Sequence, residues 1–235
     1  MKNKSLNLTN AFLSIAFLLV GFQVSAQKSV VLAVLTKHGL DKDLVNPRYF
    51  KQPDNYAYDL QQTTKAVDKT TALEAKYNPA LPEGEKWTIV SVDGKSPSKG
   101  DIKTFTKSLR EEKDESKPLD ESFRVEDEKN DYLLLSYKVD PSTLSKETNF
   151  MKDCRMFLRI NLTTKRLESS SVSNEKPIKI KMLTADKFVG TAQYKWDERE
   201  HRYFTVRNEL QMNSKFFGQH VHIETYSEYS NFEKK

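Results

Sequence analysis

The chain has 235 residues, 30% of them charged, and a formal net charge of +5. Its 38 basic and 33 acidic side chains indicate a mixed, soluble surface rather than one adapted to a polyanion. This composition argues against a nucleic-acid partner.

Residues 1–26 are predicted to form a cleavable signal peptide. Lys2 and Lys4 precede a 12-residue apolar core at 11–22, and Ala26 ends a small-residue cleavage site. Twelve apolar residues are too few to cross a bilayer, which takes about 20, so a retained anchor is the weaker alternative. No cysteine follows the core to carry a lipid anchor. We expect a cut after Ala26 and a protein that is soluble in the periplasm or secreted.

The mature chain would have 209 residues, with 36 basic and 33 acidic side chains, a length that suits one large domain. Cys154 is the lone cysteine, so no internal disulfide is expected. Residues 27–55 are a poorly defined N-terminal segment, in which 30–39 (VVLAVLTKHG) suits either a short helix or an edge strand. Residues 56–235 are expected to form the single β domain.

The first readable elements of that domain are strands followed by a helix. Residues 55–79 predict two strands around a turn near Lys65, and 85–95 predict a third strand that ends in an Asp-Gly turn. A helix is expected near 97–113, where Ser96 or Ser98 can cap it. Its apolar positions have helical spacing: Ile102, Phe105 and Leu109.

The stretch from 107 to 131 is dominated by charge, with 16 charged residues among 25. It is interpreted as a solvated helix end and a mobile loop, with an acidic docking site as the alternative.

Period-2 alternation dominates after residue 120. In 154–162 (CRMFLRINL), Cys154 shares an apolar face with Met156 and Leu158, which predicts a half-buried strand and a buried thiol. Similar runs recur, separated by short polar breaks that suit hairpins rather than helical crossovers. Residues 120–232 therefore predict an antiparallel meander. The runs lie at 131–139, 176–183, 188–196, 202–206, 209–217 and 220–226.

His220, His222 and Glu224 alternate with apolar residues, which raises the question of a metal site. Residues i and i+2 of a strand share a face about 6.6–7 Å apart, so two imidazoles can meet one metal. Three ligands along one strand converge poorly, and His201 would have to be brought in from the preceding polar break. We interpret the row as the exposed face of a strand and expect no metal.

Signatures of catalysis are weak. No Gly-x-Ser-x-Gly occurs, and two Ser-x-x-Lys matches at 96–99 and 173–176 lack their partner motifs. Six glycines in the mature chain form no phosphate-binding loop. We therefore predict no catalytic residue, no cofactor and no enzyme activity.

The remaining signal is aromatic, with 22 Phe, Trp and Tyr in the mature chain. Two interpretations stay open: a core packed under the sheet, or a curved sheet around an apolar cavity that binds a ligand. For the second interpretation, the candidate ligand-binding residues on the apolar face are Phe188, Tyr194, Trp196, Phe204, Met212 and Phe216.

Four segments together carry a family resemblance: 77–105 (YNPALPEGEKWTIVSVDGKSPSKGDIKTF), 158–172 (LRINLTTKRLESSSV), 194–204 (YKWDEREHRYF) and 226–232 (YSEYSNF). The chain resembles an uncharacterised family of exported bacterial proteins that is similar to the periplasmic lipoprotein-carrier superfamily. The resemblance implies a strongly curved antiparallel half-barrel sheet, lined with apolar residues and closed by helices.

The expected fold is thus mainly β (α+β), a curved antiparallel half-barrel meander with one or two helices. The expected function is non-enzymatic binding of a lipid, an acyl chain or a lipoprotein client. The alternative is a protein-interaction or envelope-structural module whose apolar face meets an envelope protein.

Overall fold

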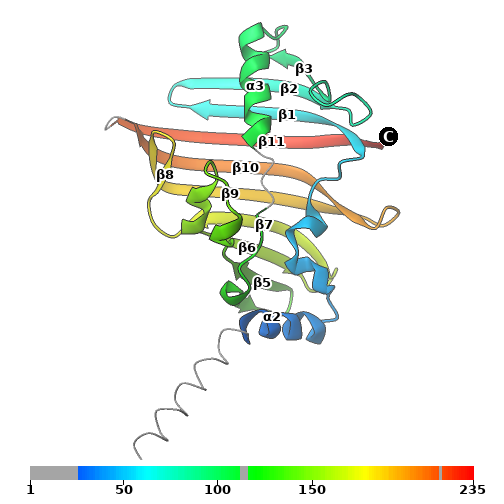
Figure 1. Ribbon diagram of the computed structural model, residues 1–235. Helices are drawn as coiled ribbons and strands as arrows, with labels where there is room; N and C mark the ends of the chain where they lie inside the picture. The colour runs from blue at the N-terminus through cyan, green and yellow to red at the C-terminus, as the bar shows by residue number, and fades with distance from the viewer. Residues whose placement is uncertain (1–25, 112–115, 217–218) are drawn as a thin grey trace, which may run out of the picture.

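The computed structural model describes residues 26–111, 116–216 and 219–235. Apart from its last residue, the predicted signal peptide lies outside these ranges. The described residues form two α-helices, α2 (Ala26–Lys37) and α3 (Lys99–Glu111), and an eleven-stranded sheet (Figure 1). The strands are β1 (Tyr56–Ala66), β2 (Lys69–Tyr77), β3 (Trp87–Val92), β4 (Arg124–Glu128), β5 (Tyr132–Tyr137), β6 (Cys154–Asn161), β7 (Arg166–Asn174), β8 (Ile178–Ile180), β9 (Leu183–Asp197), β10 (Arg202–Phe216) and β11 (Gln219–Lys234).

The sheet is antiparallel throughout, in the order β3-β2-β1-β11-β10-β9-β7-β6-β5-β4, with β8 paired to β9 alone. From β4 to β11 successive strands are neighbours, apart from β8, as short polar connections require. The first hairpin then joins the other side of β11, because β1 pairs with it from Tyr56↔Lys234 to Ala66↔Ile223. The sheet ends at β3 and β4 and does not close. The predicted mainly β fold with an open, curved antiparallel sheet is confirmed.

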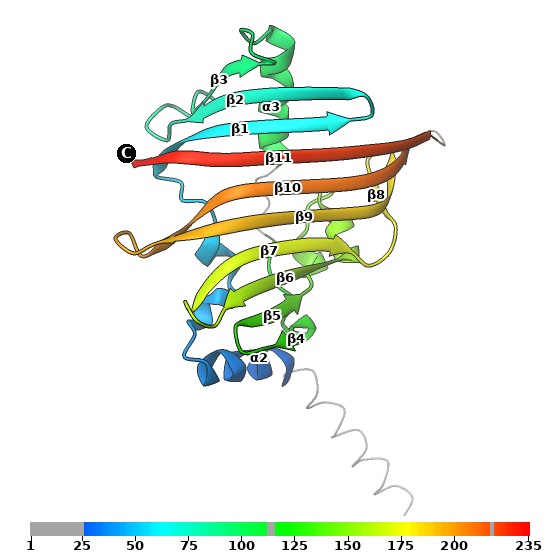
Figure 2. The same ribbon diagram turned by 180° about the vertical axis from the view of Figure 1, so that it is seen from behind.

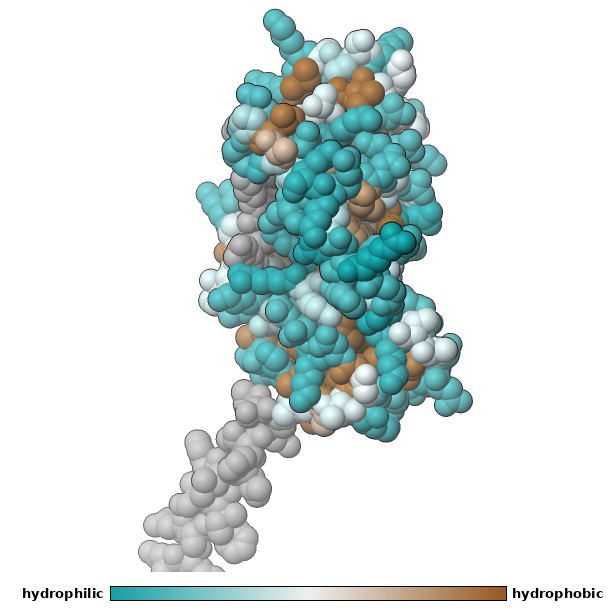
Figure 3. Space-filling view, turned by 90° about the vertical axis from the view of Figure 1, so that its right-hand side faces the viewer, coloured by the Kyte–Doolittle hydropathy of each residue, from teal (hydrophilic) through white to brown (hydrophobic). Residues whose placement is uncertain are grey.

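The two faces of the sheet differ in what covers them. We call inner the face that carries α3 and three 3-10 turns, η1 (Lys42–Val45), η2 (Pro47–Phe50) and η5 (Asn149–Asp153) (Figure 1). From behind, the outer face shows strands with no element in front of them (Figure 2). All three apolar clusters of the core include inner-face residues. Seen edge-on, the molecule is mostly hydrophilic, with hydrophobic patches toward both ends (Figure 3).

The N-terminal segment is an integral part of the largest apolar cluster. Residues 30–37 belong to a helix, which resolves the alternative of helix or edge strand. Val31 and Leu35 are fully buried with the side chains of β5 and β6. Lys37 and His38 contact the Glu128 carboxylate on β4 at 2.6 and 2.8 Å. The helix therefore protects the β4 end of the sheet, an edge that would otherwise be open to pairing.

Helix α3 begins as the sequence indicates. The Ser98 hydroxyl accepts from the Asp101 backbone N–H at 3.2 Å, and the Ser98 N–H donates to the Asp101 carboxylate at 2.8 Å. The Ser98 hydroxyl also donates to this carboxylate at 2.6 Å, and the two hydrogen bonds from Ser98 hold the pKa of Asp101 below its ordinary value. Phe105 is buried against the ring of Trp87 on β3, whereas Ile102 is exposed. The side chain of Leu109 lies outside the described residues.

Two expectations need correction. The charged stretch at 107–131 holds more than a helix end and a loop, because β4 lies within it and pairs with β5. Met182 falls within the strand predicted over 176–183 but lies in the turn between β8 and β9, where it is exposed. No described helix is long and apolar enough to cross a membrane.

We predict that Leu35→Ala lowers the free energy of unfolding by about 2–5 kcal/mol, because it removes a fully buried side chain from the largest cluster. Urea unfolding followed by circular dichroism measures the change. Val30→Ala on the same helix is the control, since Val30 is 54% exposed and should change stability by less than about 0.5 kcal/mol. Equal effects would show that residues 26–50 are not part of the folded domain.

Candidate functional site

The six predicted ligand-binding residues do not line one cavity. Phe188 and Met212 are register partners on β9 and β10, in a cluster with buried Cys154, Ile178 and Ala185. Phe188 is half-buried, and its ring meets that of Phe150 on η5 at 5.6 Å. These two predicted residues lie together on the inner face.

Tyr194 and Trp196 lie further along β9, where the N-terminal segment covers them. The Tyr194 ring meets Phe50 at 5.3 Å, and the Trp196 ring meets Tyr49 at 6.4 Å and Tyr203 at 4.9 Å. Burial raises the pKa of Tyr194 to about 12. At this end of the inner face the aromatic side chains belong to a packed core, which is the first of the two interpretations that the sequence leaves open.

Phe204 is separated from the other predicted residues of β10 by a β-bulge between Thr205 and Arg207, which interrupts the regular alternation along the strand. It pairs with Lys195, whereas Met212 pairs with Phe188. Its ring packs against Tyr56 and Phe232, with centroids 5.0 and 4.6 Å away. Phe216 ends β10, and its side chain lies outside the described part of the chain.

A half-buried apolar surface does exist around Phe188 and Met212. Across the inner face, Phe188, Met212 and Ile223 form one row, and Val172, Gly190 and Leu210 form the next. A Cβ on Gly190 would lie 3.0 Å from Val172 Cγ1, so the glycine allows this valine to pack closely. Sequence reasoning missed three of the members, although their alternation was visible. We call the following residues the inner-face strip: Val172, Phe188, Leu210, Met212 and Ile223.

A band of polar side chains borders the inner-face strip along the middle of the sheet. These residues satisfy one another, since Gln62 donates to Ser227 at 3.1 Å and Asn208 donates to the Tyr229 hydroxyl at 3.1 Å. Thr64 and Thr225 lie 3.2 Å apart. The band separates the strip from the apolar cluster under α3, so the inner face has no single apolar lining from end to end.

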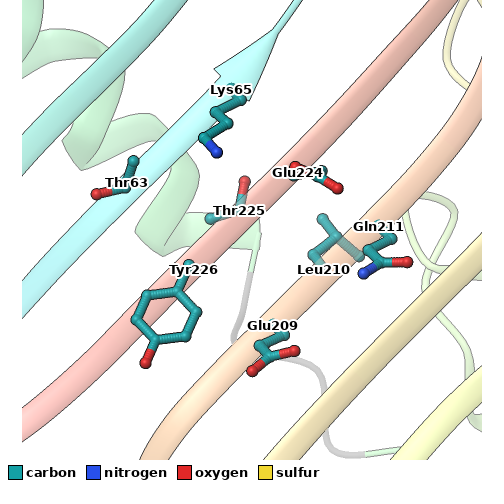
Figure 4. A pocket seen from close by; sticks show the side chains of 8 residues that line it. All are labelled: Thr63, Lys65, Glu209, Leu210, Gln211, Glu224, Thr225 and Tyr226. Atoms are coloured by element: carbon teal, nitrogen blue, oxygen red, sulfur yellow. The ribbon is translucent and has the colours of Figure 1, made fainter.

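The outer face carries a shallow polar groove of about 400 Å³ over β1, β11 and β10 (Figure 4). Lys65, Glu224 and Gln211 form one row across it, and Thr63, Tyr226 and Glu209 form the next. The Tyr226 hydroxyl donates to Glu228 at 2.6 Å, and the Arg207 guanidinium lies 5.0 Å from the Tyr226 ring. The hydrogen bonds that Glu228 accepts from Tyr226 and, at 2.9 Å, from Arg207 hold the pKa of Glu228 below its ordinary value. The groove has the character of a solvated strand face.

His222 and Glu224 lie on this same outer face, as their spacing predicts. His222 Nε2 is 3.1 Å from the Glu224 carboxylate, and its Nδ1 is 2.5 Å from the Asn213 amide oxygen. Both imidazole nitrogens therefore have partners within the sheet. His220 pairs with Lys215 and is exposed. Among the residues that the structure describes, no three His, Cys, Asp or Glu side chains converge as metal ligands.

Cys154 is buried on the apolar face of β6, as predicted, and is 1% exposed. Burial raises the pKa of its thiol to about 11, with smaller contributions from Asp153 and Glu175. The thiolate fraction at neutral pH is correspondingly small, which is the opposite of what a nucleophilic cysteine requires.

We predict that Cys154 in the folded protein reacts with a thiol reagent at pH 8 at least about 100-fold more slowly than in urea, because the reactive thiolate is disfavoured and the sulfur is buried. Labelling followed by intact mass measures both rates. Labelling of the folded protein as fast as of the unfolded chain would contradict this placement.

Comparison with known proteins adds little to this geometry. No protein-family model matches the chain, and no curated protein sequence matches it. Among solved structures, it is similar to a DUF1329 family protein from Desulfovibrio piger ATCC 29098, with 9% identity and a TM-score of 0.38. The alignment covers 91% of this chain and 93% of that chain. A TM-score this low carries no argument, and the resemblance to lipoprotein carriers stays a prediction.

Proposed function

We propose that this is an exported, non-enzymatic binding protein that carries an apolar chain, such as the acyl chain of a lipid or a lipoprotein, on the inner-face strip. The proposal rests on one observation: the rest of the protein covers the side chains of this strip only in part. Val172, Phe188, Leu210 and Ile223 stay half-buried, although α2, α3 and the 3-10 turns pack on other parts of that face.

The size of the strip indicates reversible binding. Apolar surface removed from water contributes about 25 cal/mol per Å², so a chain covering about 200 Å² gains about 5 kcal/mol. The loss of translational and rotational freedom offsets part of that gain. A bound chain would therefore leave readily, which suits transfer between sites rather than storage.

The polar residues support binding rather than catalysis. The Cys154 thiol is buried and protonated, and His222 is held between Asn213 and Glu224. Next to the outer groove, Arg207 pairs with Glu228 at 2.9 Å, and the Tyr226 hydroxyl of the groove donates to the same carboxylate at 2.6 Å. None of these arrangements places a nucleophile beside a free base.

A second candidate function rests on the edge of β3. This strand pairs with β2 alone, and exposed Val90 lies on it while exposed Ile102 lies on the neighbouring helix. An uncovered strand with apolar neighbours suits addition of a strand from an envelope protein. Native mass spectrometry of the exported protein separates the two functions, because a lipid carrier retains a mass that organic solvent extracts, whereas a partner module retains a protein mass.

We predict that Leu210→Thr weakens binding of a fluorescent fatty acid by about fivefold to tenfold, because a hydroxyl replaces apolar surface in the strip. Fluorescence titration of the exported protein measures the affinity. Val189→Thr is the matched control, since Val189 is also half-buried but faces the outer side of the adjacent strand. Equal affinities of the two variants, or no binding by the unaltered protein, would contradict the proposal.

A further inference from the structure

The two most exposed large apolar side chains of the described residues lie at the same end of the sheet. Val67, in the β1–β2 turn, is 69% exposed, and Met182, in the β8–β9 turn, is 67% exposed. Both views show these turns on the same side of the molecule as the ends of β10 and β11 (Figures 1 and 2). We call this side the hairpin edge, comprising Val67, Asp68, Lys181, Met182 and the ends of β10 and β11 at 214–216 and 219–221.

Val67 adopts a backbone conformation that disfavours valine. Its φ is +55°, in the left-handed region where glycine and asparagine are common and β-branched residues are rare. Its side chain is exposed, so the residue gains no burial to offset the strain. Neither local conformation nor packing therefore accounts for an apolar side chain at this position.

Positive charge surrounds the two exposed apolar residues. Six exposed lysines near the hairpin edge face three carboxylates, Asp68, Asp186 and Glu224, which leaves a net charge of +3. Lys215 and Asp186 form an ion pair at 3.2 Å. Beside them, His222 is already paired with Glu224 at 3.1 Å. The six lysines are Lys65, Lys69, Lys179, Lys181, Lys187 and Lys215.

The opposite edge of the sheet differs in composition. The β9–β10 turn there is Glu198, Arg199, Glu200 and His201, without an apolar residue. Glu198 pairs with Arg166 at 3.2 Å, and Glu200 pairs with Lys234 at 2.8 Å. The β9–β10 turn thus lacks the combination of exposed apolar tips and excess lysine that the hairpin edge has.

We propose that the hairpin edge docks the protein on the surface of a bilayer that contains anionic lipids. Val67 and Met182 enter the boundary between headgroups and acyl chains, and the lysines contact the anionic headgroups. Charge complementarity selects this partner, since each lysine near such a surface strengthens binding by about fivefold. Short hairpin tips contact the surface without crossing it.

The hairpin edge also continues into the apolar interior. Ile180 and Leu183, on either side of the Lys181–Met182 turn, belong to the same cluster as Phe188 and Met212 of the inner-face strip. Docking here would place the strip's cluster next to the acyl chains of the membrane. The docking proposal itself does not rest on the proposed carrier function, because it concerns residues outside the strip.

We predict that Val67→Asn weakens binding to vesicles of phosphatidylcholine with about one-third phosphatidylglycerol by about fivefold to tenfold, while it raises the melting temperature by about 2–4 °C. Asparagine removes the apolar tip and relieves the positive φ. Co-sedimentation and calorimetry of the exported protein, whose intact mass shows that residues 1–26 are gone, measure the two effects. Because stability rises, lost binding cannot be attributed to unfolding.

Three further variants test the docking proposal. Met182→Ser should weaken vesicle binding by about fivefold, whereas Leu81→Ser, which is 38% exposed in the β2–β3 connection, should leave it unchanged. The double variant Lys179→Glu, Lys187→Glu should lose more than about tenfold on the anionic vesicles and little on pure phosphatidylcholine. No vesicle binding by the unaltered protein, or equal losses in Met182→Ser and Leu81→Ser, would overturn the docking proposal. Val67→Asn and Met182→Ser should bind the fluorescent fatty acid as tightly as the unaltered protein does. This result separates the test of membrane docking from the test of binding to the inner-face strip.

Discussion

The structure depends on the antiparallel pairing of β1 with β11. This contact joins the hairpin β1–β2, together with β3 and α3, to the meander that begins at β4. Without it the chain would present two smaller sheets, each with an unpaired edge and its own apolar cluster. With it, the inner face becomes one surface of eleven strands, and three separate apolar clusters have to cover it. The half-buried strip is the part that these clusters leave incompletely covered.

Much of this fold could be predicted because the alternation of apolar and polar residues is visible within short stretches of the sequence. The strand around Cys154, the long β9 and the capped helix α3 all follow from patterns within a few residues. The pairing of β1 with β11 cannot be predicted in this way, because alternation indicates which face a side chain lies on but not which strand lies beside its own. β4 was hidden because its acidic residues resemble a solvated loop. Pairing with β5 and cover by α2 decide its conformation.

The candidate site was harder to predict than the fold. Along β9 the alternation holds, so Phe188, Tyr194 and Trp196 share the inner face as their spacing indicates. On β10 the bulge near Val206 interrupts the alternation between Phe204 and Met212, although their spacing is even. A bulge adds one residue to a strand and leaves little trace in composition. The N-terminal segment then fills the Tyr194 and Trp196 end with Tyr49 and Phe50, which a sequence read strand by strand does not reveal.

The position of β11 also has a consequence for the order of events in folding. This strand follows every other strand in the chain, yet it lies between β1 and β10 in the middle of the sheet. Until it has been synthesised, β1 and β10 each have an edge without its partner, and the clusters on either side cannot be joined. Long-range pairing of this kind is slow to form. A chain whose central strand arrives late stays unfolded for longer, which is the state in which a protein can be threaded through a translocation pore.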